Sequence, residues 1–239
     1  MDKKSRKMMF FFSLQRLYEP KSDLDVLFYD EAVMLNKEER IRLCAATIPQ
    51  AKCKLWHDSR KTLFTGTKGN GILGALKNNK EGVDDNGLYS SAFITKVLDL
   101  FKEGKSKEGI EAVDHGNEFE ETARNNYRKV TKSTVVEMGI VKKDKFAWLG
   151  VSPDGLIFNP DNEEDFGLLE IKCIHSCKDG KILPEKTPYI NKDGQLQKGH
   201  RYMTQIQLGM WATGAKYTDL FLWTSQESKI VKVYPDPLI

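Results

Sequence analysis

The chain of 239 residues has no long hydrophobic run and no strong excess of charge of either sign. No stretch approaches the ~18 to 20 apolar residues that span a bilayer, so we expect no membrane span. The short apolar run MMFFFSL near the N-terminus lacks a small-residue cleavage pattern and is not expected to be a signal sequence. The net charge of +3 and the isoelectric point near 8.5 permit a polyanionic partner without requiring one.

Cysteine and histidine are also scarce, with four residues of each. The cysteines form no CxxC pair and no disulfide framework, which is typical of the reducing interior of a cell. Two interpretations of them stay open: an iron–sulfur or zinc site, and free buried thiols. No two histidines have the helical spacing of a metal-ligand pair. The four cysteines are Cys44, Cys53, Cys173 and Cys177.

Hydrophobic residues make up 40% of the chain and charged residues 30%, which fits one compact domain with a sizeable core. The periodicity predicts helices first, then strands, one more helix and two final strands. This order indicates a mixed α/β fold with a small central mixed sheet flanked by helices. We divide the chain into an N-terminal helical element packed on the core, residues 1–50, and a main domain, residues 51–239.

Local signals place the individual elements. Asn36 is a candidate N-cap with Glu39 three residues later, which predicts a helix over residues 37–46. Residues 56–76 mix threonine and glycine without a clear period, and we expect a turn-rich segment that leads into a short helix. Further helices are expected over 90–101, 111–130 and 200–213, and strands over 146–152, 167–173, 219–225 and 229–234.

The stretch GLLEIKC, residues 167–173, reads as a strand that carries two opposite charges on one face. Side chains alternate along a strand, so Glu170 and Lys172 point to the same side. One interpretation is an ordinary solvated pair, worth less than about 1 kcal/mol. The other is a functional pair that faces a substrate, and the surrounding sequence has to decide between them.

A second carboxylate precedes this strand. Asp154 follows another predicted strand at a Pro-Asp-Gly turn, sixteen residues before Glu170, so the two carboxylates can meet at one edge of the sheet. Magnesium binds oxygen ligands and usually takes one or two protein carboxylates. The backbone carbonyl of Ile171 can supply another oxygen, and Lys172 would face the attacking water or the phosphate charge. Asp followed by Glu-x-Lys is a weak motif when it stands alone.

Four ordered blocks strengthen the motif: GNEFEETA, LGVSPDGLI, LLEIKC and YMTQIQLGMW. Together they resemble the phage lambda exonuclease family, the YqaJ-type viral recombinases of the PD-(D/E)xK nuclease superfamily, over about Trp56 to Trp211. The resemblance implies a restriction-endonuclease-like core, with residues 51–239 as the nuclease domain. It implies Mg²⁺ as cofactor, with Mn²⁺ as a substitute, held by Asp154, Glu170 and the Ile171 carbonyl and assisted by Glu120. The catalytic set that it implies is Glu120, Asp154, Glu170, Lys172 and Gln205.

The resemblance also implies a receptor for a 5′-phosphate. In the family, an arginine follows a tryptophan, and a serine follows the arginine seven residues later. Here the arginine is Arg60 and a threonine, Thr67, takes the place of the serine. Ser152 and Lys178 fall where the family has further phosphate contacts, with lysine in place of an arginine, so the bidentate geometry of a guanidinium is lost. Taken singly, Lys178 also reads as a solvated lysine.

Neighbouring side chains receive simpler interpretations. We expect Glu118, Glu121 and Gln207 to be exposed. His175 is expected at the surface. Core packing is expected for Met210, Trp211, Phe221 and Trp223.

The leading hypothesis is a Mg²⁺-dependent exonuclease that degrades one strand of linear double-stranded DNA from its 5′ end. It would release mononucleotides and leave a 3′ overhang for a single-strand annealing partner. One alternative is an endonuclease or broad alkaline DNase or RNase of a large DNA virus. Another is an inactive protein that binds DNA ends during recombination.

Two departures from the family bear on assembly and place of action. Residues before Trp56 have no counterpart, and the family's terminal helix after the last strands is not evident before Ile239. The ring-shaped homotrimer that the resemblance implies therefore stays open. The expected location is intracellular, in the cytoplasm of a bacterial host or, for a eukaryotic virus, in the host nucleus or cytoplasm.

Overall fold

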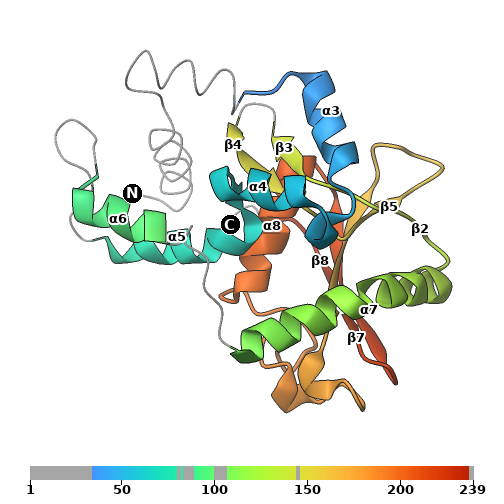
Figure 1. Ribbon diagram of the computed structural model, residues 1–239. Coiled ribbons are helices and arrows are strands. Elements are labelled where there is room, and N and C mark those ends of the chain that lie inside the picture. The colour runs from blue at the N-terminus through green and yellow to red at the C-terminus, as the bar shows by residue number, and fades with distance from the viewer. Residues whose placement is uncertain (1–33, 80–81, 83–88, 100–106, 144–145, 237–239) are drawn as a thin grey trace.

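The computed structural model describes residues 34–79, 82, 89–99, 107–143 and 146–236 (Figure 1). The first described helix is α3 (Lys37–Ala46), and its capping box is confirmed. The Asn36 side chain accepts a hydrogen bond from the Glu39 amide at 3.0 Å, and the Glu39 carboxylate accepts one from the Asn36 amide at 2.8 Å. Each cap satisfies a backbone amide that the helix itself cannot pair.

The helix α3 packs on strand β3 (Val141–Lys143) at a very close backbone approach. A Cβ atom at Gly139 would lie 2.0 Å from the carbonyl oxygen of Cys44, so only glycine fits there. Residues 1–33 lie outside the described residues. The division of the chain at residue 50 therefore stays a prediction.

A five-stranded mixed sheet forms the centre of the protein, in the order β2-β5-β6-β7-β8. The pair β6 and β7 is parallel, and the other neighbouring pairs are antiparallel. Parallel neighbours need a crossover, and helix α8 (Arg201–Thr213) supplies it between β6 and β7. The strands are β2 (Thr134–Val136), β5 (Gly155–Phe158), β6 (Gly167–Cys173), β7 (Tyr217–Trp223) and β8 (Ser228–Val233).

Helices cover both faces of this sheet (Figure 1). On one face Leu168 packs in the same cluster as Ile206 of α8. On the other face Leu169 packs with Tyr127 of α7 (Lys107–Thr131), the longest described helix. Because side chains alternate along β6, positions 170 and 172 share the α8 side with Leu168.

A second, three-stranded sheet has the order β1-β4-β3. It contains β1 (Phe64–Thr65) and β4 (Phe146–Val151), which pair in parallel. The expected strands at 146–152 and 167–173 therefore belong to different sheets. The turn at Pro153 and Asp154 carries the chain from one sheet to the other, and β5 then pairs with β6. The mixed α/β fold with flanking helices is confirmed.

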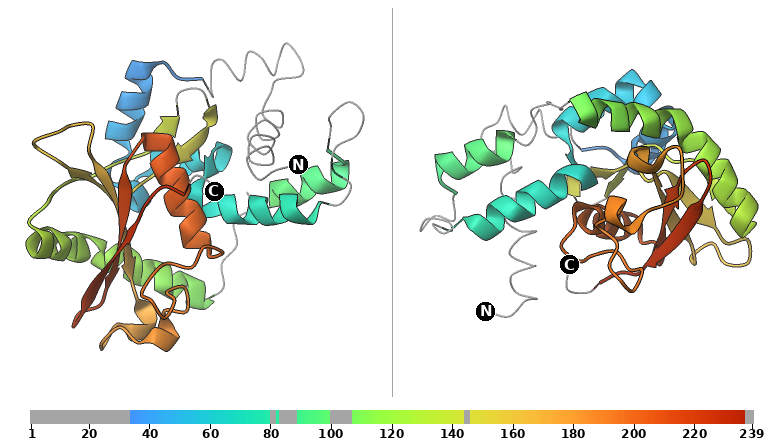
Figure 2. Two further views of the ribbon diagram at one scale, coloured as in Figure 1. Left: turned by 180° about the vertical axis from the view of Figure 1, so that it is seen from behind. Right: turned by 90° about the horizontal axis from the view of Figure 1, so that it is seen from below.

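Over residues 56–76 we predicted a turn-rich segment that leads into a short helix, and only the helix at its end is confirmed. This part of the chain forms α4 (Lys54–Thr62) and the thirteen-residue helix α5 (Gly66–Asn78). The glycines of α5 let it pack closely on α8, since a Cβ at Gly69 would lie 2.6 Å from the Leu208 side chain. Figure 2 shows α5 and its neighbour α6 (Ser91–Asp99) extending to one side of the sheets.

Most expectations about the core are confirmed. Phe93 and Val97, in the helix expected over residues 90–101, are buried in α6. The core residues Met210, Phe221 and Trp223 are buried, and Trp211 packs at the edge of a core cluster. Helix α8 ends at Gly214, whose φ of 85° is the left-handed C-cap expected of glycine.

The expectation that Gln207 is exposed was wrong, because only 8% of this residue is exposed. Its amide nitrogen donates to the Tyr234 carbonyl at 2.9 Å, and its oxygen accepts from the Asp236 amide at 2.9 Å. The side chain thus pairs with the segment that follows β8. Within the described part of the chain, no helix combines the length and apolarity that a membrane crossing requires.

Candidate active site

The strand β6 places a buried carboxylate and an ammonium on the face that α8 covers. Glu170 is 6% exposed, and the Lys172 ammonium contacts its carboxylate. Lys172 also donates to the carbonyl oxygen of Ile171 at 3.1 Å. A solvated surface pair is therefore the wrong interpretation of GLLEIKC, because water has little access to the carboxylate.

Asp154 lies beside this strand at the start of β5. Its backbone amide donates to the Leu169 carbonyl at 3.1 Å, and its carboxylate accepts from the Ile171 amide at 2.6 Å. These two bonds fix the aspartate next to the residues that flank Glu170. The structure therefore brings the Pro-Asp turn and the Glu-x-Lys strand together at one place, across a turn and two hydrogen-bonded strands.

Two helices contribute the remaining members of the predicted catalytic set. Gln205 of α8 donates its side-chain amide to the Glu170 carboxylate at 2.6 Å. Glu120 of α7 pairs with Arg124, one turn later, at 2.5 Å between Nη2 and Oε1. Its neighbours Glu118 and Glu121 are exposed, as expected.

The electrostatics of the site follow from burying several carboxyl groups together. Burial raises the pKa of Glu170 to about 7, with a further contribution from Asp154, against the opposing effects of Lys172 and Gln205. Burial and Asp154 raise the pKa of Glu120 to about 7, against the effect of Arg124. The pKa of Asp154 is raised as well, again chiefly by burial.

Lys172 has the opposite balance. Burial lowers the pKa of its ammonium, but Glu170 and Asp154 outweigh this effect and raise the pKa above the ordinary value of 10.5. The lysine therefore stays protonated at neutral pH. Three carboxyl groups are buried together at this site, where water solvates their negative charge poorly. This arrangement favours the binding of a further cation.

The donor set fits a hard divalent ion. Among the described residues no three His, Cys, Asp or Glu side chains form a closed metal cluster. Magnesium does not need one, because one or two carboxylates, water and substrate phosphate complete its shell. Asp154, Glu170 and the Ile171 carbonyl offer such oxygens. The same finding shows that the four cysteines do not form a cluster; all are free thiols.

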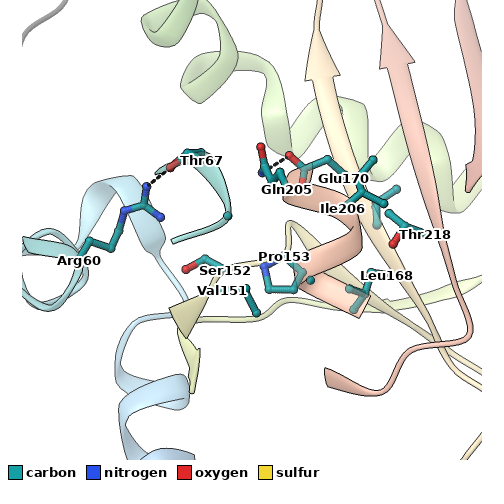
Figure 3. A pocket seen from close by; sticks show the side chains of 13 residues that line it. Arg60, Thr67, Val151, Ser152, Pro153, Leu168, Glu170, Gln205, Ile206 and Thr218 are labelled. Carbon is teal, nitrogen blue, oxygen red and sulfur yellow. Dashed lines mark hydrogen bonds between the residues drawn. The ribbon is translucent and has the colours of Figure 1, made fainter. Parts of the chain in front are cut away.

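A pocket joins this site to the predicted phosphate receptor (Figure 3). Figure 3 shows Arg60 and Thr67 at one end of the pocket, with Glu170 and Gln205 across from them and Leu168 and Thr218 farther along. Ser152 lines it from the segment before the Asp154 turn. The pocket brings three of the four predicted phosphate contacts together with two members of the predicted catalytic set.

Arg60 contacts Thr67 directly, and Trp56 links Arg60 to Ser152. The Arg60 guanidinium lies 4.0 Å from the ring centroid of Trp56, and its Nη2 donates to Thr67 Oγ1 at 3.3 Å. The Trp56 indole donates to Ser152 Oγ at 3.0 Å. Thr67 stands in the first turn of α5, where unpaired backbone amides and the helix dipole favour an anion.

Lys178 lies apart from this group. It is exposed and lines a separate hollow with His175 and Lys181, in the loop that follows β6. Arg124 was not predicted from the sequence as part of the site. The residue is 5% exposed, and its guanidinium contacts both Glu120 and the Asp154 turn. Its position four residues after Glu120 was the available signal.

The comparisons with known proteins agree with the fold. Residues 55–216 match the model of the YqaJ-like viral recombinase domain. An alkaline exonuclease, LHK-Exo from Laribacter hongkongensis, is 23% identical with a TM-score of 0.51, covering 76% of this chain and 81% of its own. Its complex with dAMP gives 24% identity, a TM-score of 0.52, and coverage of 76% and 82%.

A SOX–DNA complex is 12% identical, with a TM-score of 0.52, and the match covers 90% of this chain and 75% of that one. At these identities the structures establish a shared fold. No curated protein sequence matches the chain significantly. Because the family model spans more than half of its residues, including the Asp154 turn, β6 and α8, the chain belongs to the YqaJ-like viral recombinase family.

Proposed function

We propose that this protein is a metal-dependent exonuclease that degrades one strand of linear double-stranded DNA in the 5′ to 3′ direction. The observation that carries the proposal is the pocket that runs from Arg60 and Thr67 to Glu170 and Gln205. A terminal phosphate at the first end would place the neighbouring phosphodiester at the second. An exonuclease and a DNA complex among the structures of the same fold support this substrate class.

In this proposal Asp154, Glu170 and the Ile171 carbonyl hold Mg²⁺, with Mn²⁺ as a substitute, and Glu120 assists. When bound, the ion supplies Lewis acidity and lowers the pKa of water. Lys172 holds its proton and stabilises the negative charge that develops on the phosphate oxygens. Gln205 keeps Glu170 oriented through its amide and orients the attacking water with its carbonyl oxygen.

The bond that breaks joins phosphorus to the 3′ oxygen of the terminal nucleotide. Water adds to phosphorus and gives up a proton, and the 3′ oxygen leaves with the released mononucleotide and gains one. The new strand end therefore carries a 5′-phosphate again. Each cycle regenerates the group that Arg60, Thr67 and Ser152 are proposed to bind, and the growing 3′ overhang suits a single-strand annealing partner.

The test is nucleotide release, in Mg²⁺ and in EDTA, from three substrates: a linear duplex with 5′-phosphates, the same duplex with 5′-hydroxyls, and a closed circle. Labels at the 5′ and 3′ ends report the direction of digestion. We expect Mg²⁺-dependent loss of the linear DNA only, from the 5′ end, and faster with the phosphate. Cleavage of the circle or digestion from the 3′ end would contradict the proposal.

An endonuclease is the second candidate, because Lys178 does not line the pocket with the other three receptor residues. With an incomplete receptor, an internal phosphodiester would reach the site as readily as a terminal one. Cleavage of the closed circle at a rate comparable to the linear duplex would favour this function.

A further inference from the structure

The turn that carries Asp154 is held by side chains that come from outside it. A backbone carbonyl that leaves regular structure needs a hydrogen-bond donor when water is excluded. The Gln50 side-chain amide donates to the Pro153 carbonyl at 2.9 Å. The Arg124 guanidinium donates through Nε to the Asp154 carbonyl at 3.1 Å. Two consecutive carbonyls of the turn thus each receive a donor from a distant segment.

The backbone of Gln50 has an unfavourable conformation in the position that makes this contact. Gln50 begins a short 3-10 turn (Gln50–Lys52) with a φ of 45°, in the left-handed region that favours glycine. Its amide also donates to the Met138 carbonyl at 2.9 Å, so both N–H groups are used. A glycine would relieve the backbone but lose both bonds, which indicates that the side chain is what the position requires.

Arg124 links the same turn to helix α7. Its guanidinium is buried, and its Nη2 contacts the Glu120 carboxylate while its Nη1 lies 3.3 Å from Glu137. Arg124 therefore links two residues of the proposed metal site. It contacts the carboxylate of Glu120 and the backbone carbonyl of Asp154. Gln50 bonds the turn from the segment between α3 and α4, and it lies five residues before the part of the sequence that matches the family.

We propose that Gln50 and Arg124 are positioning residues that clamp the Pro153–Asp154 turn against β6 and thereby set the affinity of the site for its divalent ion. Both side chains act through backbone carbonyls of the turn and, for Arg124, through Glu120, so their role is positioning and not catalysis. The inference rests on the proposed function, and it extends the active-site framework to a segment that precedes the matched family domain.

The test compares variants that lose the clamp with variants that lose an equivalent contact elsewhere. Gln50→Gly removes both amide bonds and relieves the positive φ, so it separates positioning from backbone strain. Its control is Thr47→Val, which removes a buried hydroxyl that accepts from the Ile140 amide at 2.8 Å but does not touch the turn. For Arg124→Met the control is Arg128→Met. Arg128 is also an arginine of α7, and it donates to the backbone carbonyl of Val135 in β2.

The readout is the Mn²⁺ dissociation constant by titration calorimetry, with Asp154→Asn as the reference for a lost site, together with Mg²⁺ half-saturation and kcat for DNA cleavage. Melting temperatures identify a temperature at which every variant is folded. We expect Gln50→Gly and Arg124→Met to weaken Mn²⁺ binding on the order of 10- to 100-fold. Thr47→Val and Arg128→Met should lower the melting temperature without changing the dissociation constant.

The outcomes distinguish a failure of the proposed nuclease function from a failure of the proposed clamp. A wild-type protein that neither binds Mn²⁺ nor cleaves DNA in Mg²⁺ would overturn the proposed function. A wild type that does both, beside a Gln50→Gly variant with unchanged Mn²⁺ affinity and Mg²⁺ half-saturation, would overturn the clamp alone. Equal losses in Gln50→Gly and Thr47→Val would also overturn it, because they would show a general loss of stability.

Discussion

Replacing Glu170 by glutamine should stabilise the protein in the absence of a divalent ion. The carboxyl has a pKa of about 7 in the folded protein, against an ordinary value of 4.5, because burial and Asp154 disfavour its charge. The protonated form therefore favours folding. Its contribution is complete below pH 4.5 and is lost as the pH rises through about 7. Glutamine is neutral throughout and is not subject to this loss.

The magnitude follows from the two pKa values. A difference of about 2.5 pH units corresponds to roughly 3 kcal/mol, at about 1.36 kcal/mol per unit. At pH 8 in EDTA, Glu170→Gln should thus unfold with a free energy about 3 kcal/mol higher than wild type. At pH 5 most of the wild-type carboxyl is protonated, and the gap should fall below about 1 kcal/mol.

The assay is urea denaturation at pH 5 and pH 8 in EDTA, with Glu121→Gln as a control on the exposed side of α7. Addition of Mg²⁺ at pH 8 should stabilise wild type but not Glu170→Gln. A Glu170→Gln variant that is equally or less stable than wild type at pH 8 would show that the charged carboxylate does not destabilise the folded protein. It would show that the Lys172 ion pair fully compensates the buried charge.

Three further predictions concern single side chains. Lys172→Met should lower the cleavage rate by about 10²- to 10³-fold while DNA-end binding persists, measured by single-turnover cleavage and filter binding. Thr67→Val should reduce the preference for a 5′-phosphate over a 5′-hydroxyl by about tenfold, whereas Thr67→Ser should retain it, measured as a ratio of rates. Gln207→Leu should cost about 1 to 3 kcal/mol in thermal unfolding, since it leaves the Tyr234 carbonyl and the Asp236 amide without this partner. An unchanged cleavage rate, phosphate preference or free energy of unfolding would contradict the role given to the corresponding side chain.

Local signals predicted the elements that local interactions determine. The box between Asn36 and Glu39 needs only a span of three residues, and Gly214 ends α8 through its own backbone freedom. The alternation of Glu170 and Lys172 along β6 likewise follows from strand geometry. These features could be read from the sequence because their partners lie within a few residues.

The full extent of helix α5 could not be predicted in the same way. Its glycines lower helix propensity, and in isolation they indicate turns. They are tolerated because α8 lies so close that a Cβ at Gly66 would stand 3.0 Å from Gln205. The reason for the glycines is thus a contact with a helix more than 130 residues away in sequence, which no local pattern records.

The site shows the same limit. The resemblance to the family predicted Glu120, Asp154, Glu170, Lys172 and Gln205 as the catalytic set. The structure places these residues on α7, on the turn before β5, on β6 and on α8. Gln50, Arg124 and the burial of Gln207 were missed, because each depends on a carbonyl or an amide from a distant segment. Such partners become visible only in the folded chain.

The proposed active site is tested by Mg²⁺-dependent release of nucleotides from a linear duplex by three proteins: wild type, Asp154→Asn and Glu118→Gln. Glu118 is exposed on α7 two residues from Glu120 and serves as the matched carboxylate control. We expect full activity in wild type and Glu118→Gln, and loss of activity in Asp154→Asn with the fold intact. Cleavage by Asp154→Asn at the wild-type rate would contradict the assignment of the active site.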